Sequence, residues 1–143
     1  MLFGKRERAI RRIVIVEDEP LVAFDNEHLL REAGYEVVAT VDNLADAVRV
    51  LGEDDDIHLV LSDITLSGDG DGTDVARAAA AKGVPVLFVT GTCPDAARAL
   101  AIGCLSKPYS DRMLRNALAA LDRKLRGEPV KRVPAGLSIY EAV

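Results

Sequence analysis

Five side chains that could handle a phosphoryl group each directly follow a short apolar run. They are three carboxylates, one hydroxyl and one ammonium: Glu17, Asp18, Asp63, Thr90 and Lys107. If the apolar runs are parallel strands, their carboxyl ends meet at one edge of a sheet, where ligands gather. We therefore expect these five side chains to lie together, although each alone would be uninformative.

The chemistry of this set favours phosphoryl transfer. Three carboxylates in one pocket repel each other and raise each other's pKa values, and a divalent cation relieves that repulsion. Oxygen ligands completed by water suit Mg²⁺. One carboxylate can then attack phosphorus and form an aspartyl phosphate. The metal and a lysine would offset charge on the phosphoryl oxygens.

The segments between these residues alternate between strand-like and helix-like patterns. Short, largely β-branched runs predict strands at residues 13–16, 36–41, 57–62, 84–89 and 104–106. Periodic or alanine-rich segments predict helices at residues 20–33, 45–51, 73–82 and 110–125, with at most a short helix at 94–102. Such alternation predicts an α/β fold with a parallel sheet and helices on both faces.

Local signals position several of these helices. Asn43 and Ser110 are expected to cap the helices that follow them, and Pro20 suits the first turn of another. In the helix that begins at Pro20, we expect an apolar stripe to face the core. That stripe comprises Leu21, Phe24, Leu29, Leu30 and Ala33.

Composition excludes several classes of function. The 143 residues carry a net charge of −5, which argues against a broad basic face for nucleic acid. No apolar run approaches the ~18 residues of a membrane span, so we expect a cytoplasmic protein without a membrane partner. The two cysteines, Cys93 and Cys104, are expected to be unpaired thiols in a reducing cytosol.

The chain is expected to form one domain with two flanking segments. Residues 1–12 read as a basic N-terminal extension, 13–126 as the domain, and 127–143 as a tail rich in proline and glycine. The tail has an apolar cluster, Leu137, Ile139 and Tyr140, which could dock on the sheet edge, remain disordered or engage a partner.

Four segments carry a resemblance to a known family. IVIVEDEP, LVLSDITL, PVLFVTGT and LSKPY resemble, in order, the signature segments of the receiver domains of bacterial response regulators. The resemblance covers roughly residues 12 to 126. It implies a flavodoxin-like (βα)5 doubly wound sheet with strand order 2-1-3-4-5.

The resemblance also implies a role for each site residue. Asp63 would be the phosphoacceptor, and Asp63, Asp18 and Glu17 would bind Mg²⁺, with Asp18 a more direct ligand than Glu17. The backbone carbonyl of Thr65 would complete the protein's share of the metal shell.

Two further residues would contact the phosphoryl group itself. Thr90 would be the switching hydroxyl, and Lys107 would contact the phosphoryl oxygens. The bond between Lys107 and Pro108 would be cis.

The sequence departs from the family pattern around its switch. Cys104 stands where most receivers carry an inward-turning aromatic ring, and Thr90 lies only 17 residues before Lys107, which implies a shortened fourth helix. PVLFVTGT is similar to the PFxFATGY-type motif of an alphaproteobacterial receiver subgroup that shares both departures. We expect phosphorylation to draw Thr90 inward and reorder residues 91–103 without a ring flip.

Together these features predict a stand-alone receiver of a two-component system or phosphorelay. It would accept a phosphoryl group from a histidine kinase or a histidine phosphotransfer protein, and signal by protein contact or onward phosphotransfer. It would catalyse nothing beyond its own phosphorylation and dephosphorylation. Two alternatives stay open: a pseudo-receiver that works without phosphorylation, and an aspartate-nucleophile phosphohydrolase. Thr65 opposes the hydrolase, because that position lacks the acid needed to protonate a leaving group.

Overall fold

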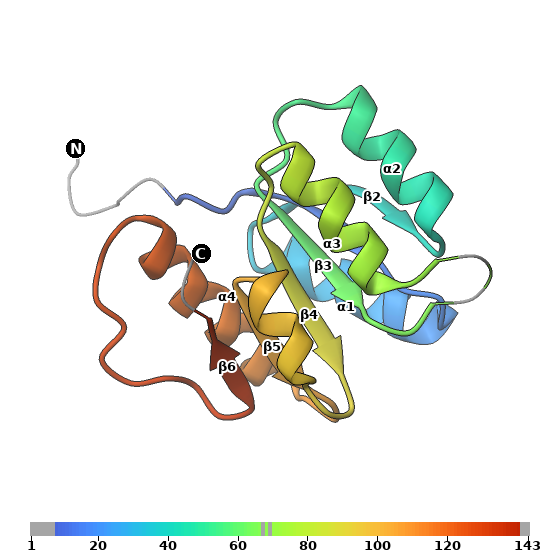
Figure 1. Ribbon diagram of the computed structural model, residues 1–143. Coiled ribbons are helices and arrows are strands. Elements are labelled where there is room, and N and C mark those ends of the chain that lie inside the picture. Colours follow the sequence, from blue (N-terminus) through green and yellow to red (C-terminus); the bar gives the residue numbers. More distant parts are fainter. Residues whose placement is uncertain (1–7, 67, 69, 141–143) are drawn as a thin grey trace.

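A six-stranded sheet forms the centre of the protein, for which a computed structural model describes residues 8–66, 68 and 70–140. Five strands are parallel and follow the order β2-β1-β3-β4-β5, and β6 adds antiparallel to β5 (Figure 1). The strands are β1 (Arg12–Val16), β2 (Glu36–Val41), β3 (Leu59–Asp63), β4 (Val86–Thr90), β5 (Gly103–Ser106) and β6 (Leu137–Ile139).

Helices cover both faces of this sheet. They are α1 (Pro20–Glu32), α2 (Leu44–Glu53), α3 (Gly72–Ala81), the 3₁₀ helix η1 (Asp95–Ala99) and α4 (Asp111–Leu125). Figure 1 shows α1 and α4 on one face of the sheet, with α2 and α3 on the opposite face. One apolar cluster joins α1 and α4 to the sheet, and a second joins α2, α3 and η1 to the other face. The predicted doubly wound fold with strand order 2-1-3-4-5 is confirmed, and the fourth helix is reduced to one 3₁₀ segment.

The alternation of side chains along a strand explains why both faces are apolar. In β1, Ile13 and Ile15 belong to the cluster under α1 and α4, whereas Val14 and Val16 belong to the other cluster. All four side chains are fully buried. Successive strand residues point to opposite faces, so a strand covered on both sides must be apolar at every position.

Side-chain caps begin three of the helices. Asn43 accepts a hydrogen bond from the Asp46 backbone N–H at the start of α2, and Ser110 accepts one from Met113 at the start of α4. Both caps were predicted from sequence. Asp71 forms a reciprocal capping box with Asp74 at the start of α3.

The predicted apolar stripe of α1 is partly wrong. Leu21 and Phe24 are 79% and 68% exposed, although both were expected to face the core. The buried positions of α1 are Ala23, Asn26, Leu29 and Leu30. Spacings of three and four residues from Ala23 to Asn26 and on to Leu30 define the packed face, and Leu21 and Phe24 lie outside it.

The C-terminal segment docks on the domain. Residues 137–139 form β6, and the following Tyr140 is only 4% exposed, with its N–H donating to the Ile102 carbonyl at 2.9 Å. The guanidinium of Arg98 on η1 lies 5.3 Å from the centre of the Tyr140 ring. This docking was one of the alternatives left open by the sequence.

The predicted domain boundaries at residues 12 and 126 remain predictions. Within the predicted N-terminal extension, Ile10 is fully buried and its N–H donates to the Asp122 carboxylate at 2.8 Å. Residues 1–7 of the predicted extension and 141–143 of the predicted tail lie outside the described residues.

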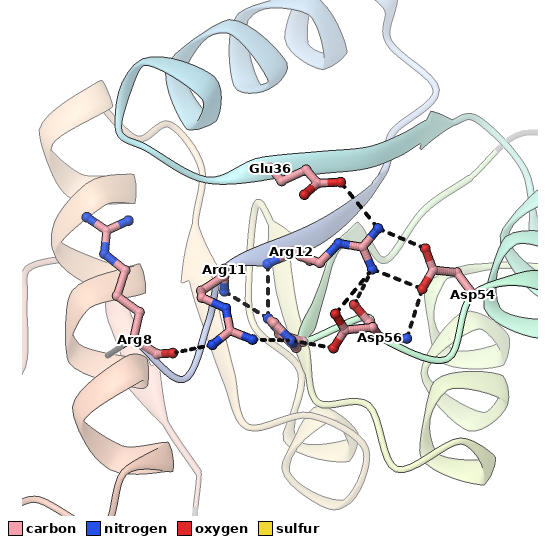
Figure 2. Close-up of polar contacts among 7 residues, drawn as sticks. Arg8, Arg11, Arg12, Glu36, Asp54 and Asp56 are labelled. Carbon is pink, nitrogen blue, oxygen red and sulfur yellow. Dashed lines mark hydrogen bonds and ion pairs between the residues drawn. The ribbon is translucent and has the colours of Figure 1, made fainter. Parts of the chain in front are cut away.

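Arg12 connects three segments at the amino end of β1, the sheet edge opposite Asp63. Its two terminal nitrogens donate to the two carboxylate oxygens of Asp54, each at 3.0 Å (Figure 2). It also donates to Glu36 on β2 at 3.2 Å and to the carbonyl of Asp56 at 2.6 Å. A two-point contact of this kind is the strong form of an arginine–carboxylate pair. The hydrogen bonds from Arg12 hold the pKa of Asp54 below its usual range.

We predict that Arg12→Met lowers the midpoint of thermal unfolding at pH 7. The depressed pKa of Asp54 means that this stabilisation is present above the unfolded pKa of about 3.9 and is lost as pH falls through the folded pKa. Unfolding curves across pH should therefore show a wild-type advantage that shrinks in acid. Arg49→Met, which removes exposed pairs within α2, is the control and should change the midpoint less. An equal effect of both changes would contradict the assigned role of Arg12.

Candidate phosphoryl-acceptor site

The predicted site residues meet at the carboxyl edge of the sheet. Glu17 and Asp18 follow β1, Asp63 ends β3, Thr90 ends β4, and Lys107 follows β5. Carboxylate oxygens of Glu17, Asp18 and Asp63 all lie within 4.8 Å of one another. Residues separated by up to 90 positions in the chain thus form one acidic cluster with a single lysine beside it.

Asp63 is held at the centre of this cluster. Its residue exposure is 7%, and its Oδ2 accepts a hydrogen bond from Lys107 Nζ at 2.7 Å. Its Oδ1 accepts the backbone N–H of Thr65 at 3.1 Å. Both oxygens therefore have fixed directions, while the carboxylate keeps the additional lone pairs that a metal or an electrophile needs.

Glu17 is the most buried of the three acids, at 3% exposed. Its Oε2 accepts the N–H of Glu19 at 3.0 Å, whereas its Oε1 accepts no hydrogen bond from any described residue. Burial raises the pKa of Glu17, with smaller increases from Asp63 and Asp18, against the lowering effects of the Glu19 N–H and Lys107. A buried carboxylate oxygen without a donor is costly unless a cation compensates it.

These acids fit a Mg²⁺ site. Three clustered carboxylates are hard oxygen ligands, and the unsatisfied Glu17 Oε1 is a position that a cation would stabilise. The predicted ligand roles of Asp18, Asp63 and Glu17 are thus compatible with the geometry. The role of the Thr65 carbonyl stays a prediction, since Thr65 contacts Asp63 here through its backbone N–H.

Lys107 is aimed at the acids by its backbone. Its N–H donates to the Thr90 carbonyl at 2.7 Å, and the Lys107–Pro108 bond is cis, as the family resemblance implied. Nζ also lies 3.7 Å from Glu17 Oε1. Burial lowers the pKa of Lys107, but the hydrogen bond to Asp63 and the charges of Glu17 and Asp63 outweigh burial, so the net pKa is raised. Lys107 therefore stays an ammonium across the physiological range.

Thr90 lies beside Lys107 rather than directly on Asp63. Strand register pairs Thr90 with Ser106 and pairs Asp63 with Val89, which places Thr90 one position beyond Asp63 on the neighbouring strand. Its side chain is partly exposed. A hydroxyl in this position can reach toward a group attached to Asp63, and its predicted switching role is compatible with that placement.

Sequence reasoning missed the contact that joins α1 to the lysine loop. The Asn26 side-chain amide donates to the Tyr109 hydroxyl at 3.0 Å, and that hydroxyl lies 3.2 Å from Asn26 Oδ1, which can accept its proton. Asn26 is 5% exposed, and burial is the main reason that the pKa of Tyr109 is raised. This pair fixes the residues that follow Lys107. The available signal in the sequence was a polar residue, Asn26, at a position of α1 that faces the core.

Sequence reasoning also missed the role of Gly72. Its N–H donates to the Ile64 carbonyl at 2.7 Å, and the first residue of α3 packs directly on the backbone that follows β3. A Cβ at this position would lie 2.2 Å from the Asp63 carbonyl oxygen. Glycine is therefore required here, because the backbone of Asp63 approaches Gly72 too closely for any side chain.

The prediction of two unpaired thiols is wrong. Cys93 and Cys104 form a disulfide, with Cα atoms 6.1 Å apart. The prediction relied on the expected redox compartment and on sequence spacing, neither of which reveals that a loop after β4 returns beside β5. That Cα distance lies within the usual range for a bridged pair.

The fold and the site define a CheY-like receiver: a doubly wound sheet with an acid cluster and a lysine at its carboxyl edge. A family model described as "Response regulator receiver domain" matches residues 13–119. The chain therefore belongs to the receiver domain family of response regulators. Among the described residues, no helix is both long and apolar enough to cross a membrane.

Individual relatives agree with this family. The chain is 35% identical over 79 residues to the phyllosphere-induced regulator PhyR of Methylorubrum extorquens, covering 54% of this chain and 30% of PhyR. It is 35% identical over 106 residues to the transcriptional regulatory protein PdtaR of Mycobacterium tuberculosis, covering 70% of this chain and 51% of PdtaR. The solution structure of SdrG from Sphingomonas melonis Fr1 is similar with a TM-score of 0.67 and 34% identity, covering 80% of this chain and 98% of SdrG. The chain thus spans about half or less of the two curated relatives.

We predict that Gly72→Ala destabilises the protein by about 1–3 kcal/mol, because the new methyl group would overlap the Asp63 carbonyl. Chemical denaturation measures this change. Gly52→Ala is the matched control, since no atom lies within 4 Å of a Cβ built at that position in α2. The control should leave stability unchanged or raise it. Equal stabilities of the two variants would show that the backbone near Asp63 tolerates the added group.

Proposed function

We propose that this receiver accepts a phosphoryl group on Asp63 from a phosphohistidine and transmits its phosphorylation state by protein contact or onward phosphotransfer. The observation that carries the proposal is the Lys107–Asp63 hydrogen bond of 2.7 Å inside a cluster of three carboxylates. A buried acid that is paired with a lysine and close to two other acids suits a nucleophile whose product bears extra negative charge.

The proposed step is a displacement at phosphorus. An Asp63 carboxylate oxygen forms the new bond to phosphorus, the bond from phosphorus to the donor's imidazole nitrogen breaks, and the imidazole leaves with the electron pair. Lys107 lies close enough to Asp63 to donate a hydrogen bond to a phosphoryl oxygen once the new bond has formed. When bound by Glu17, Asp18, Asp63 and the predicted Thr65 carbonyl, Mg²⁺ supplies positive charge that offsets repulsion between the carboxylates and the incoming phosphoryl group.

Thr90 is proposed to report the new phosphoryl group. A phosphoryl group adds about −1.5 to −2 charge and three strong acceptor oxygens, which can bias a loop that has two arrangements. Drawing the Thr90 hydroxyl inward would pull on residues 91–94, which connect β4 to the short η1. The fully buried Cys104 offers no aromatic ring to turn, so the loop itself would carry the change.

The surface beside Lys107 supplies a docking place for the donor. A hollow of about 490 Å³ lies between α1 and the segment after β5, and its lining includes Asn26, Lys107 and Tyr109. The exposed apolar side chains Leu21 and Phe24 lie on the same helix α1. Large exposed apolar groups near a reactive centre suit contact with a protein partner. A histidine kinase or a histidine phosphotransfer protein, acting in the cytoplasm, is the proposed partner.

A first prediction tests acceptance itself. With acetyl phosphate and Mg²⁺, the wild-type protein should gain the mass of one phosphoryl group, and Asp63→Asn should gain none. Chelation of the metal with EDTA should abolish the gain. Intact mass spectrometry measures each result, and Asp25→Asn, which removes an exposed acid from the nearby α1, is a control that should retain the gain.

Failure of this experiment would redirect the proposal. If neither acetyl phosphate nor any phosphorylated histidine kinase adds mass to the wild type, the receiver works without phosphorylation. The observation that favours this alternative is Cys104, which occupies the family's aromatic position and is bonded to Cys93.

A second prediction tests the docking place. Phe24→Ser should slow phosphotransfer from an autophosphorylated histidine kinase roughly tenfold or more, as loss of an exposed aromatic anchor does at protein interfaces. It should leave phosphorylation by acetyl phosphate unchanged, because that small donor needs no docking surface. Val48→Ser, which changes an apolar residue on α2 that is 46% exposed, is the control. Equal transfer rates for the two variants would remove Phe24 from the docking surface.

A further inference from the structure

The disulfide joins the two segments that carry the phosphoryl-contacting side chains. Cys93 lies three residues after Thr90, and Cys104 lies three residues before Lys107. The disulfide therefore closes a loop between two cysteines that are 11 positions apart, and this loop contains η1. Thr90 lies just before the loop in the chain, and Lys107 lies just after it. The Lys107 N–H bonds the Thr90 carbonyl just outside this closed loop.

The two cysteines differ in their exposure to solvent. Cys104 is fully buried in β5, opposite Phe88 on β4 and Ser138 on β6. Cys93 is partly exposed in the loop between β4 and η1, and its sulfur lies 3.9 Å from the Ser106 hydroxyl. A soluble oxidant or thiol can therefore reach Cys93 first, while Cys104 is placed to act on Cys93 from within the protein.

The proposed function places this bond in a reducing compartment. A phosphohistidine donor made with ATP works in the cytoplasm, where disulfides that do form are usually transient and redox-sensing. A partly exposed cysteine bonded to a fully buried one fits an attacking and a resolving cysteine.

We propose that Cys93 and Cys104 form a reversible modification site whose substrates are hydroperoxides and low-molecular-weight or protein thiols. In oxidation by hydrogen peroxide, the Cys93 thiolate attacks one oxygen, so an S–O bond forms and the O–O bond breaks. The hydroxide that leaves takes up the proton released by the Cys93 thiol, which gives a sulfenic acid and water. The Cys104 thiol then displaces the sulfenic oxygen as a second water and forms the disulfide. In sum, two thiols and hydrogen peroxide give one disulfide and two waters. In reduction, an external thiolate attacks Cys93, which breaks the bond to Cys104 and leaves a mixed disulfide on Cys93. A second external thiol then attacks the external sulfur of this mixed disulfide and releases Cys93. The two external thiols end as one disulfide, and both cysteines end as thiols.

The consequence for signalling, which rests on the proposed function, follows from the loop that the bond closes. Oxidation ties the segment after Thr90 to β5 and so favours the arrangement observed here. Reduction releases residues 91–103 to reorder around a phosphoryl group. A receiver of this kind would respond to its kinase strongly when reduced and weakly when oxidised, because the bond biases one of the two loop arrangements.

The first test uses the whole chain and needs no phosphoryl donor. The oxidised protein is equilibrated in glutathione buffers that span cytosolic redox conditions, free thiols are trapped with a maleimide, and intact mass is read. We expect two reactive thiols to appear within that range, and hydrogen peroxide to remove them again with the loss of two hydrogen atoms. Cys93→Ser and Cys104→Ser should each abolish the intramolecular bond. A disulfide that persists under the most reducing cytosolic condition, or never forms with peroxide, would overturn the proposal.

The second test measures the coupling. Amide hydrogen exchange across residues 91–103 is compared for the oxidised and dithiothreitol-reduced protein, with Cys93→Ser as a permanently reduced form. Faster exchange on reduction, by threefold or more, supports the proposed tether, and equal exchange overturns it. Beryllofluoride, a phosphoryl analogue, is then bound with Mg²⁺ to each state, and we expect at least threefold tighter binding to the reduced state. If neither state bound it, the proposed function would fail while the redox result and the exchange result would still decide this inference.

Discussion

The carboxylates of Glu17, Asp18 and Asp63 share one small pocket at the carboxyl edge of the sheet. The ammonium group of Lys107 must offset the repulsion between their negative charges. The hydrogen bond from Lys107 to Asp63 meets part of this electrostatic demand, and the unsatisfied oxygen of Glu17 shows that it is not met in full. The neighbouring structure holds these charges in place. β1, β3 and β5 bring the acids and the lysine to one edge, α3 begins against the Asp63 backbone, and Asn26 secures the residues after the lysine.

Stability and reactivity are concentrated at opposite ends of the same strand. At the amino end of β1, Arg12 donates to both carboxylate oxygens of Asp54 and also to Glu36 (Figure 2). At the carboxyl end, Glu17 and Asp18 follow β1 into a cluster where negative charge is in excess. An excess of clustered carboxylates is the condition that makes the carboxyl end of β1 responsive to an added cation.

The acidic residues that follow buried strands were predictable from sequence, because a short apolar run directly followed by an acid can be recognised locally. The sheet order and the convergence of Glu17, Asp18 and Asp63 followed from that pattern and from the resemblance. Features that depend on distant segments were not predictable in this way. Position 72 must be glycine because a Cβ there would lie 2.2 Å from the Asp63 carbonyl oxygen. The Cys93–Cys104 bond depends on the path by which the loop after β4 returns to β5. In α1, apolar content alone misassigned Phe24, because exposed apolar residues and core residues look alike in sequence.

The short strand β6 changes what the sheet presents to its surroundings. In its absence, β5 would be an outer strand, and one row of its backbone N–H and C=O groups would be unpaired, an arrangement that invites pairing with another chain. With β6 in place, Ser106 donates to the Gly136 carbonyl and Tyr140 to that of Ile102, so the row is occupied by the protein's own backbone. Removing residues after α4 would thus expose an aggregation-prone edge beside the disulfide. Shortened forms of this protein should therefore retain the chain through Tyr140, so that the backbone groups of β5 stay paired.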